Sequence, residues 1–109
     1  MSIRYSIDEI KNWEYNVEIH DYDESTNTVT LLFREVNQKD GFGVTISLDE
    51  FKKLMKNPDE FEKWCNEQVK SRKQLLIKIV QQEKSKEEKL KKIKEEYSKV
   101  LKVVKVKGD

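Results

Sequence analysis

Four short motifs with the pattern Ser or Asn, any residue, Asp or Glu, then Glu divide this chain into helical segments. They occupy residues 6–9, 47–50, 57–60 and 85–88. In such a motif the first side chain accepts a hydrogen bond from a free amide of the first helical turn, and the acidic side chains favour the positive end of the helix dipole. Pro58 follows Asn57 directly, and proline suits the first helical position. The motifs predict helices that begin after residues 6, 47, 57 and 85.

Three stretches of alternating apolar and polar residues lie between the first two motifs. Their apolar positions are Tyr15, Val17, Ile19, Val29, Leu31, Phe33, Phe42, Val44 and Ile46. Alternation with one apolar face indicates a half-buried antiparallel sheet. Segments 23–27 and 37–41 are rich in turn residues and short enough for hairpins. We therefore predict an α+β fold in which residues 6–56 run α-β-β-β-α around a three-stranded antiparallel sheet.

A sheet with one apolar face needs a cover, and two of the expected helices carry suitable side chains. They are Ile7, Ile10 and Trp13 in the first helix, and Phe51, Leu54 and Met55 after Ser47. We expect both helices to pack on the sheet.

Residues 59–107 contain neither glycine nor proline, so helix is allowed throughout. Apolar residues follow a heptad seam, with Glu83 and Lys86 at two intermediate positions. The seam otherwise contains Cys65, Val69, Arg72, Leu76, Ile79, Leu90, Ile93, Tyr97, Val100 and Val104. Two charges in the seam beside the motif at Ser85 favour a turn and a helical hairpin. The alternative is one rod of about 70 Å, which would have to dimerise to hide its apolar stripe. The β-branched segment 103–107 suggests that the last helix ends early.

The length of 109 residues is typical of one domain. We expect residues 1–57 to form the sheet module and residues 58–109 to form a coiled-coil-like helical part that packs on it or extends from it. Charge is distributed unequally between the halves. Residues 1–50 carry 4 basic and 11 acidic side chains, a balance of −7, whereas residues 51–109 carry 18 basic and 10 acidic ones, a balance of +8. Opposed charge in the two halves is informative about binding partners.

The sequence lacks the residues that most chemical functions need. No apolar run approaches the roughly 20 residues of a membrane span, and no leader pattern precedes the first motif, so a soluble protein of the cytoplasm is expected. A single cysteine, Cys65, excludes an internal disulfide. His20 and Cys65 are too few for a structural zinc site, and Gly41-Phe42-Gly43 lacks the features of a phosphate-binding loop. We expect no enzymatic activity, no metal and no cofactor.

Two charged regions are candidate binding surfaces. The acidic candidates lie on strands, strand ends and loops of the sheet: Glu14, Glu18, Asp21, Asp23, Glu24, Glu35 and Asp40. Few cations lie near them in the sequence, so we expect most to be unpaired and able to occupy a basic groove on another protein. The basic candidates for contact with nucleic acid are Lys89, Lys92 and Lys99, although pairs such as Glu88–Lys92 are also typical of a solvated helix face.

Several short motifs resemble a group of small phage anti-CRISPR proteins. The matching segments are Ile7-Asp8-Glu9-Ile10-Lys11-Asn12, Glu14-Tyr15-x-Val17, Asn27-Thr28-Val29-Thr30, Arg34-x-Val36-Asn37, Asp40-Gly41 and Val44-x-Ile46-Ser47. The likeness covers about residues 3–47, and members of that group also run helix, three antiparallel strands, then helices. They inhibit the type II RNA-guided nuclease by binding where the PAM duplex docks.

The resemblance implies a protein partner, namely a CRISPR effector nuclease with its guide RNA, in the cytoplasm of a phage-infected host. Glu14, Asp40 and Gly41 match positions of contact in that family. The chain departs from the family in Phe42-Gly43, which replace polar and acidic residues, and in a lysine-rich rather than acidic helical end. The sequence thus supports three hypotheses: a nuclease inhibitor acting through its acidic sheet, an interaction module that forms a homodimer through the helical stripe, and a nucleic-acid-binding accessory protein.

Overall fold

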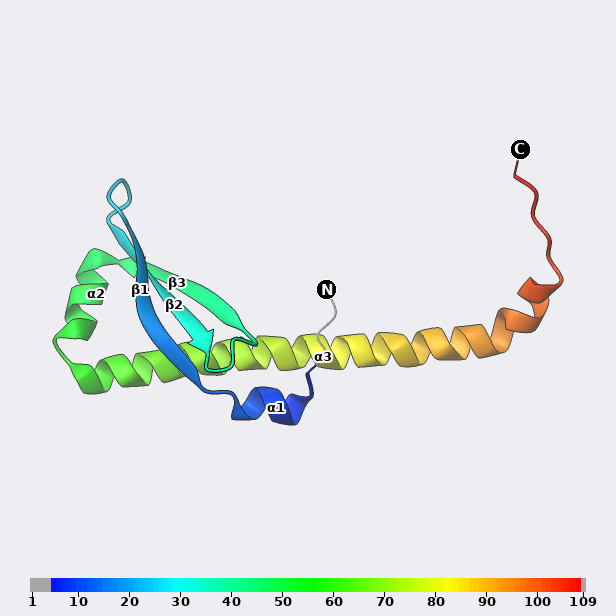
Figure 1. Ribbon diagram of the computed structural model, residues 1–109, viewed down its shortest axis with the longest axis horizontal. Helices are drawn as coiled ribbons and strands as arrows, with labels where there is room; N and C mark the ends of the chain where they lie inside the picture. The colour runs from blue at the N-terminus through cyan, green and yellow to red at the C-terminus, as the bar shows by residue number, and fades with distance from the viewer. Residues whose placement is uncertain (1–4, 109) are drawn as a thin grey trace.

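A computed structural model describes residues 5–108 and shows a small sheet lying against one end of a long helix (Figure 1). The elements are α1 (Ile7–Asn12), β1 (Tyr15–Asp23), β2 (Thr28–Glu35), β3 (Gly41–Ser47), α2 (Leu48–Met55) and α3 (Pro58–Lys102). The α+β class and the α-β-β-β-α order are therefore confirmed.

Three of the four capping motifs begin helices as predicted. The side chains of Ser6, Ser47 and Asn57 accept hydrogen bonds from the amides of Glu9, Glu50 and Glu60 at 3.1, 3.1 and 3.3 Å. These bonds satisfy amides that have no partner inside the helix.

The fourth motif does not begin a helix, and the predicted hairpin is wrong. Ser85 lies inside α3, which runs unbroken for 45 residues. Serine costs only a few tenths of a kcal/mol in a helix, and no glycine or proline interrupts the segment. Glu83 and Lys86 do not break the helix, because this part of α3 lies beyond the sheet, where charged seam residues are not placed in an apolar core.

The sheet has the order β1-β2-β3 and both pairings are antiparallel. The register of β1 on β2 shifts between Ile19 and Asp21, whereas β3 pairs with β2 without a shift. Asn27 and Gln38 adopt positive φ angles of 55° and 61° in the two connections. Asparagine is one of the residues that tolerates this conformation in tight turns. The two predicted hairpins are confirmed.

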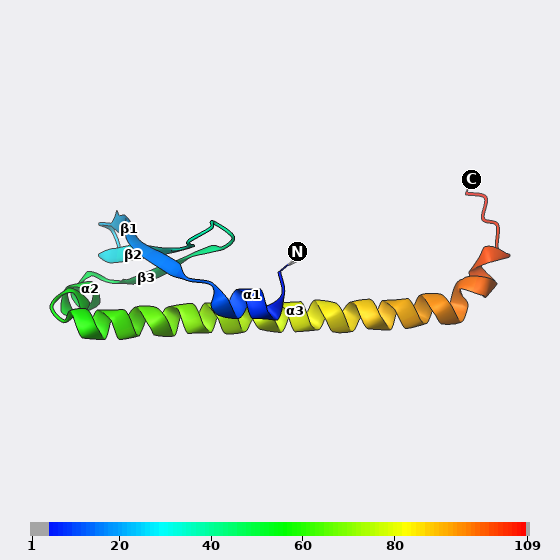
Figure 2. The ribbon, with the colours of Figure 1, turned by 60° about the horizontal axis from the view of Figure 1, so that its bottom comes forward.

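The core consists of two clusters, and both are completed by α3. In the first, Val29, Leu31 and Phe33 of β2 are buried beneath residues of β1, β3, α2 and the start of α3, and the α3 members are Phe61, Trp64, Cys65 and Val69. In the second, Ile10 and Trp13 pack against Leu76. The expectation that the opening helix covers the sheet is therefore wrong: α1 lies on α3, next to the sheet (Figure 2).

The second half of α3 projects past the sheet and α1. The molecule measures 70 × 37 × 20 Å, and the long dimension is that of α3 (Figures 1 and 2). The helix ends at Lys102, Val103 forms a turn and residues 104–108 have no regular structure, so the early end suggested by residues 103–107 is confirmed.

Truncating Ile10 tests whether α1 is held by its contact with α3. Its side chain is fully buried, so Ile10→Ala should lower the free energy of unfolding by about 2–4 kcal/mol, through lost apolar contact and the cavity left behind. Leu75→Ala removes a side chain that is 50% exposed on α3 and should cost less than about 1 kcal/mol. Urea unfolding followed by circular dichroism measures both values, and equal losses would contradict the assigned role of Ile10.

Candidate functional site

The most strongly interacting polar group in the structure is the carboxylate of Asp40, just before β3. Arg72 of α3 donates two hydrogen bonds to it, from Nε at 3.0 Å and from Nη2 at 2.7 Å. The hydroxyl of Tyr15 donates a third at 2.6 Å. The Asp40 side chain is only 9% exposed, and the guanidinium of Arg72 also lies over the ring of Phe42 at 5.7 Å. This bidentate ion pair connects the β2–β3 turn to the first half of α3.

The protonation of this cluster follows from its contacts. Burial acts to raise the pKa of Asp40, but the hydrogen bonds from Arg72 and Tyr15 outweigh burial and hold that pKa below its ordinary value. Burial, followed by the hydrogen bond to Asp40, raises the pKa of the Tyr15 hydroxyl. The hydrogen bond with Asp40 raises the pKa of Arg72. Asp40 and Arg72 are therefore charged and Tyr15 is neutral over the physiological range.

The position of Asp40 contradicts its expected role as an unpaired anion. Its charge is neutralised inside the molecule, so the cluster holds the sheet on the helix and leaves no carboxylate free for a cationic partner. The heptad pattern places Arg72 in the apolar seam, and sequence reasoning missed its function. One signal was present: an arginine between the apolar positions Val69 and Leu76 must find an anion on whatever packs against that face.

Several other acidic candidates are also engaged within the chain. Glu18 forms an ion pair of 3.1 Å with Arg34 on the exposed side of the sheet. Glu35 is buried, and one of its carboxylate oxygens accepts hydrogen bonds from the amides of Asn37 and Lys39. Glu35 thereby stabilises the β2–β3 turn, and the expectation that it is unpaired is wrong.

Within the described part of the chain, acidic groups without a cationic partner remain at the two ends of β1, with Glu14 before its first residue and Asp21 and Glu24 near the β1–β2 turn. Asp23 accepts hydrogen bonds from the hydroxyl and amide of Ser25, and the hydroxyl bond is the main reason that its pKa is lowered. Glu14, Asp21 and Glu24 are exposed, and no salt bridge joins them to a cation within residues 5–108. The turn of the β1–β2 hairpin projects beyond β3 (Figure 1). Gly41, which the resemblance implies as a contact together with Glu14 and Asp40, is exposed at the first position of β3.

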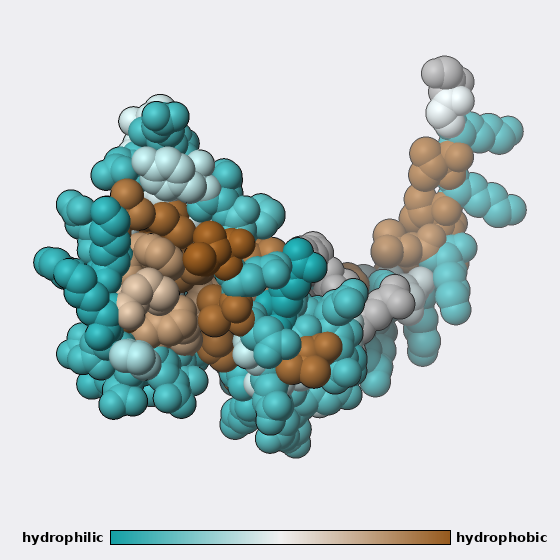
Figure 3. All heavy atoms as spheres, turned by 60° about the vertical axis from the view of Figure 1, so that its left-hand side comes forward, coloured by the Kyte–Doolittle hydropathy of each residue, from teal (hydrophilic) through white to brown (hydrophobic). Residues whose placement is uncertain are grey.

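The projecting half of α3 exposes the apolar stripe that the heptad pattern predicted. Exposed fractions are 47% for Leu90, 55% for Ile93, 51% for Tyr97 and 61% for Val100. In the first half of α3 the same seam is covered: Cys65 and Val69 meet the sheet cluster, and Leu76 meets α1. Figure 3 shows apolar residues gathered around the sheet and again near the C-terminal end of the helix. The candidate nucleic-acid contacts, Lys89, Lys92 and Lys99, are exposed on this same half of α3.

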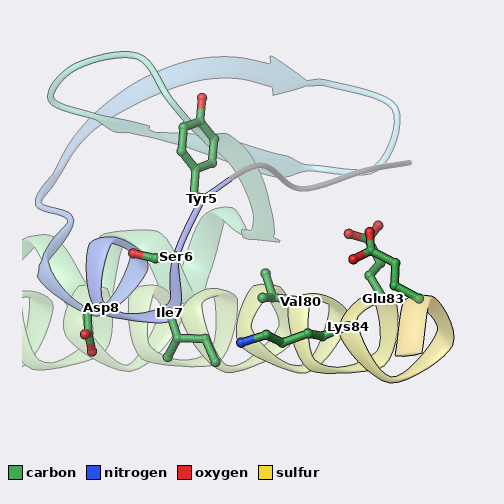
Figure 4. Close-up of a pocket in the computed structure, with 8 residues that line it drawn as sticks. Tyr5, Ser6, Ile7, Asp8, Val80, Glu83 and Lys84 are labelled. Carbon is green, nitrogen blue, oxygen red and sulfur yellow. The ribbon is translucent and has the colours of Figure 1, made fainter. Parts of the chain in front are cut away.

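A notch of about 500 Å³ marks the place where the covered half of the seam ends. One wall is the segment before and within α1, and the other is the middle of α3 (Figure 4). The lining residues are Tyr5, Ser6, Ile7, Asp8, Val80, Glu83, Lys84 and Glu87. Among residues 5–108 the structure brings together no group of three side chains suited to holding a metal ion. The described part of the chain also has no helix with the length and apolar character of a membrane span.

Neutralising Asp40 tests the structural role of the ion pair. Asp40→Asn should lower the free energy of unfolding by roughly 2 kcal/mol, because Arg72 loses a charged partner in a largely buried site. Asp21→Asn, at an exposed position, should change it by less than about 0.5 kcal/mol. Urea unfolding at neutral pH measures both values, and an equal effect of the two changes would contradict the role given to the pair.

The same pair predicts a pH dependence. Because the folded pKa of Asp40 is lowered, its contribution is complete above the ordinary carboxyl pKa of about 4 and is lost as the pH falls through the lowered value. Urea midpoints measured between pH 6 and pH 2 should therefore fall more steeply for the natural chain than for Asp40→Asn. Parallel curves for the two proteins would contradict this assignment.

Comparison with known proteins gives no family assignment. No protein-family model, no curated protein sequence and no solved structure matches this chain.

Proposed function

We propose that this protein is a non-enzymatic interaction protein that self-associates through the projecting half of α3. The observation that supports this proposal is the row of four large apolar side chains, each about half exposed, on the part of the helix that extends past the sheet and α1 (Figure 1). An exposed apolar stripe on a long helix is typical of a helix that pairs with another. A second copy offers the same stripe, with the same spacing.

The covered half of the seam restricts how two copies pair. The sheet and α1 occupy the seam side of α3 as far as Val80. A straight helix drifts by only about 20° per heptad, so the exposed stripe stays on roughly the same side as the sheet. A parallel partner in register would put two sheet modules into one space. An antiparallel partner puts them at opposite ends, so the fold favours antiparallel pairing.

The charges beside the stripe favour the same orientation. In the register in which Leu90 of one copy packs against Ile93 of the other, antiparallel helices bring Lys89 next to Glu96 and Glu87 next to Lys94 across the interface, all opposite charges. This register pairs the two apolar residues at the start of the stripe and places Tyr97 opposite Lys86. A parallel pair in register places Lys89 next to Lys94, which have like charges. In the antiparallel arrangement Val100 of the second copy lies opposite Glu83, so the end of its helix reaches the notch beside α1.

Two substitutions test the stripe itself. Leu90→Lys with Ile93→Lys places charges at the centre of the proposed interface and should convert a dimer into a monomer, as measured by light scattering after size-exclusion chromatography. Both side chains are about half exposed in the single chain, so its circular dichroism and unfolding midpoint at low concentration should change little. Lys91→Glu with Ser98→Lys changes charges beside the stripe and serves as the control. A natural chain that is monomeric at every concentration would refute the proposal.

A charge exchange tests the orientation. Lys89→Glu should weaken an antiparallel dimer about tenfold at low salt, because the carboxylate introduced at position 89 then faces Glu96 of the second copy. Adding Glu96→Lys to the same chain restores opposite charges and should restore the affinity. Sedimentation equilibrium measures both. A parallel dimer would instead bind more tightly with Lys89→Glu, since that change removes the repulsion from Lys94, and this result would reject the antiparallel arrangement.

A second function, inhibition of an RNA-guided nuclease, is supported by the exposed acidic groups at the two ends of β1. We propose Glu14, Asp21 and Glu24 as the contacts with a cationic groove, since Asp40 is engaged by Arg72. The triple reversal to lysine should abolish capture by a guide-loaded type II nuclease and leave self-association intact. Glu62→Lys, on the exposed surface of α3, is the matched control. Unchanged capture would exclude this surface.

A further inference from the structure

The outer edge of β3 has none of the features that protect the edge of a sheet. Exposed edge strands normally carry charges, proline or a bulge, which prevent pairing with another chain. The other edge strand, β1, fits that rule, with Glu18 and Asp21 and a register shift between Ile19 and Asp21. The sequence of β3 is Gly-Phe-Gly-Val-Thr-Ile-Ser, without a charge or proline, and its pairing with β2 is regular.

The contacts among residues 5–108 do not require the two glycines in β3. Neither Gly41 nor Gly43 has a positive φ, and neither lies at a bulge. A Cβ atom added at Gly43 would lie 3.5 Å from Cγ2 of Thr30, and one at Gly41 would lie 3.7 Å from the carbonyl oxygen of Phe33. These are ordinary contacts, so larger residues would fit. Glycine inside a strand weakens it, and it often marks a place where another backbone approaches closely.

The backbone groups of these residues point away from the sheet. The amide of Leu48 donates to Asn27, and the amide of Glu35 donates to Asp40. In an antiparallel pair such bonded positions alternate, so Phe42, Val44 and Ile46 bond to β2. The amides and carbonyls of Gly43 and Thr45 therefore face the outer edge, and both residues are exposed. The amide of Gly41 instead donates to the carboxylate of Asp40.

The same chain contains a segment after α3 whose sequence has the character of a strand and that has no strand partner among the described residues. After α3, residues 103–107 read Val-Val-Lys-Val-Lys, and Val103 and Val106 are 81% and 85% exposed. β-branched residues favour strands, and from Val104 to Lys107 the alternation of valine with lysine gives one apolar and one cationic face.

This segment is too far from β3 of its own chain. Arg72, which contacts Asp40 beside β3, and Lys102 are thirty residues apart on one helix, or about 45 Å. Residues 103–108 extend for only about 20 Å. The segment and the edge therefore meet only between copies.

We propose that residues 103–107 of a second copy bind along the outer edge of β3 as a fourth strand. Val104 and Val106 would extend the apolar face formed by Phe42, Val44 and Ile46, and the stems of Lys105 and Lys107 would lie on the other face, where Gly41 and Gly43 leave room. The net charges suit this contact, since the segment carries two lysines and residues 1–50 have a balance of −7. Strand addition at a free edge is a recurrent mode of recognition. The inference rests on the proposed self-association, because antiparallel pairing directs each C-terminal segment toward the sheet of the other copy.

Paramagnetic broadening between copies tests this contact. A copy with Val106→Cys and Cys65→Ser, carrying a nitroxide at residue 106, is mixed with an isotope-labelled, diamagnetic copy of the full chain. The amide signals of Gly43 and Thr45 in the labelled copy should lose most of their intensity. A nitroxide introduced with Lys91→Cys, on the projecting half of α3, should leave those two signals unchanged.

A second variant keeps the result interpretable. Gly43→Pro in the labelled copy removes the outward-facing amide and places a ring on the edge, so the broadening at Thr45 should disappear while the other signals of the sheet keep their positions. Broadening confined to α3 would overturn the strand addition and leave self-association in place. A mixture that shows no broadening and scatters light as a monomer would overturn both.

Discussion

The structure depends on one constraint: the first half of α3 is the shared surface on which both apolar clusters are completed. The sheet buries Val29, Leu31 and Phe33 partly against Phe61 and Trp64, and α1 buries Ile10 and Trp13 against Leu76. A three-stranded sheet with one apolar face is not stable unless a second layer covers it. The ion pair between Asp40 and Arg72 fixes the sheet along the helix, because its bidentate geometry admits one arrangement.

The division of α3 into a covered and an exposed half follows from the sizes of its partners. The sheet and α1 are short, so they cover the seam only as far as Val80. The heptad pattern continues past that point to Val100, on residues that the rest of the chain does not reach. Charged residues dominate the remaining surface of this half, whereas the exposed apolar side chains follow one line along the helix. A helix of this kind combines a folded module with an arm suited to pairing.

Tertiary contacts decide which of the acidic side chains in the sheet region are available to a binding partner. In the sequence, Asp40, Glu18 and Glu35 look alike, since few cations lie near them in the chain. In the fold each has a different partner: Arg72 from thirty-two residues away, Arg34 across a strand pair, and the amides of the adjacent turn. What remains available for binding is the smaller set on β1 and its hairpin. The resemblance to anti-CRISPR proteins stays a prediction.

The sequence by itself determined the local structure: three helix starts, three strands with their apolar faces, two hairpins and the heptad stripe. These features depend on hydrogen bonds and periodicities within a few residues, which a linear pattern records. Only the tertiary structure decided that Ser85 lies inside a continuous helix, that α1 packs on α3, and that Arg72 neutralises Asp40. Those outcomes depend on contacts between residues that are far apart in the chain. A capping motif or a charged residue is compatible with several such contacts, and only the packing of the whole fold selects one.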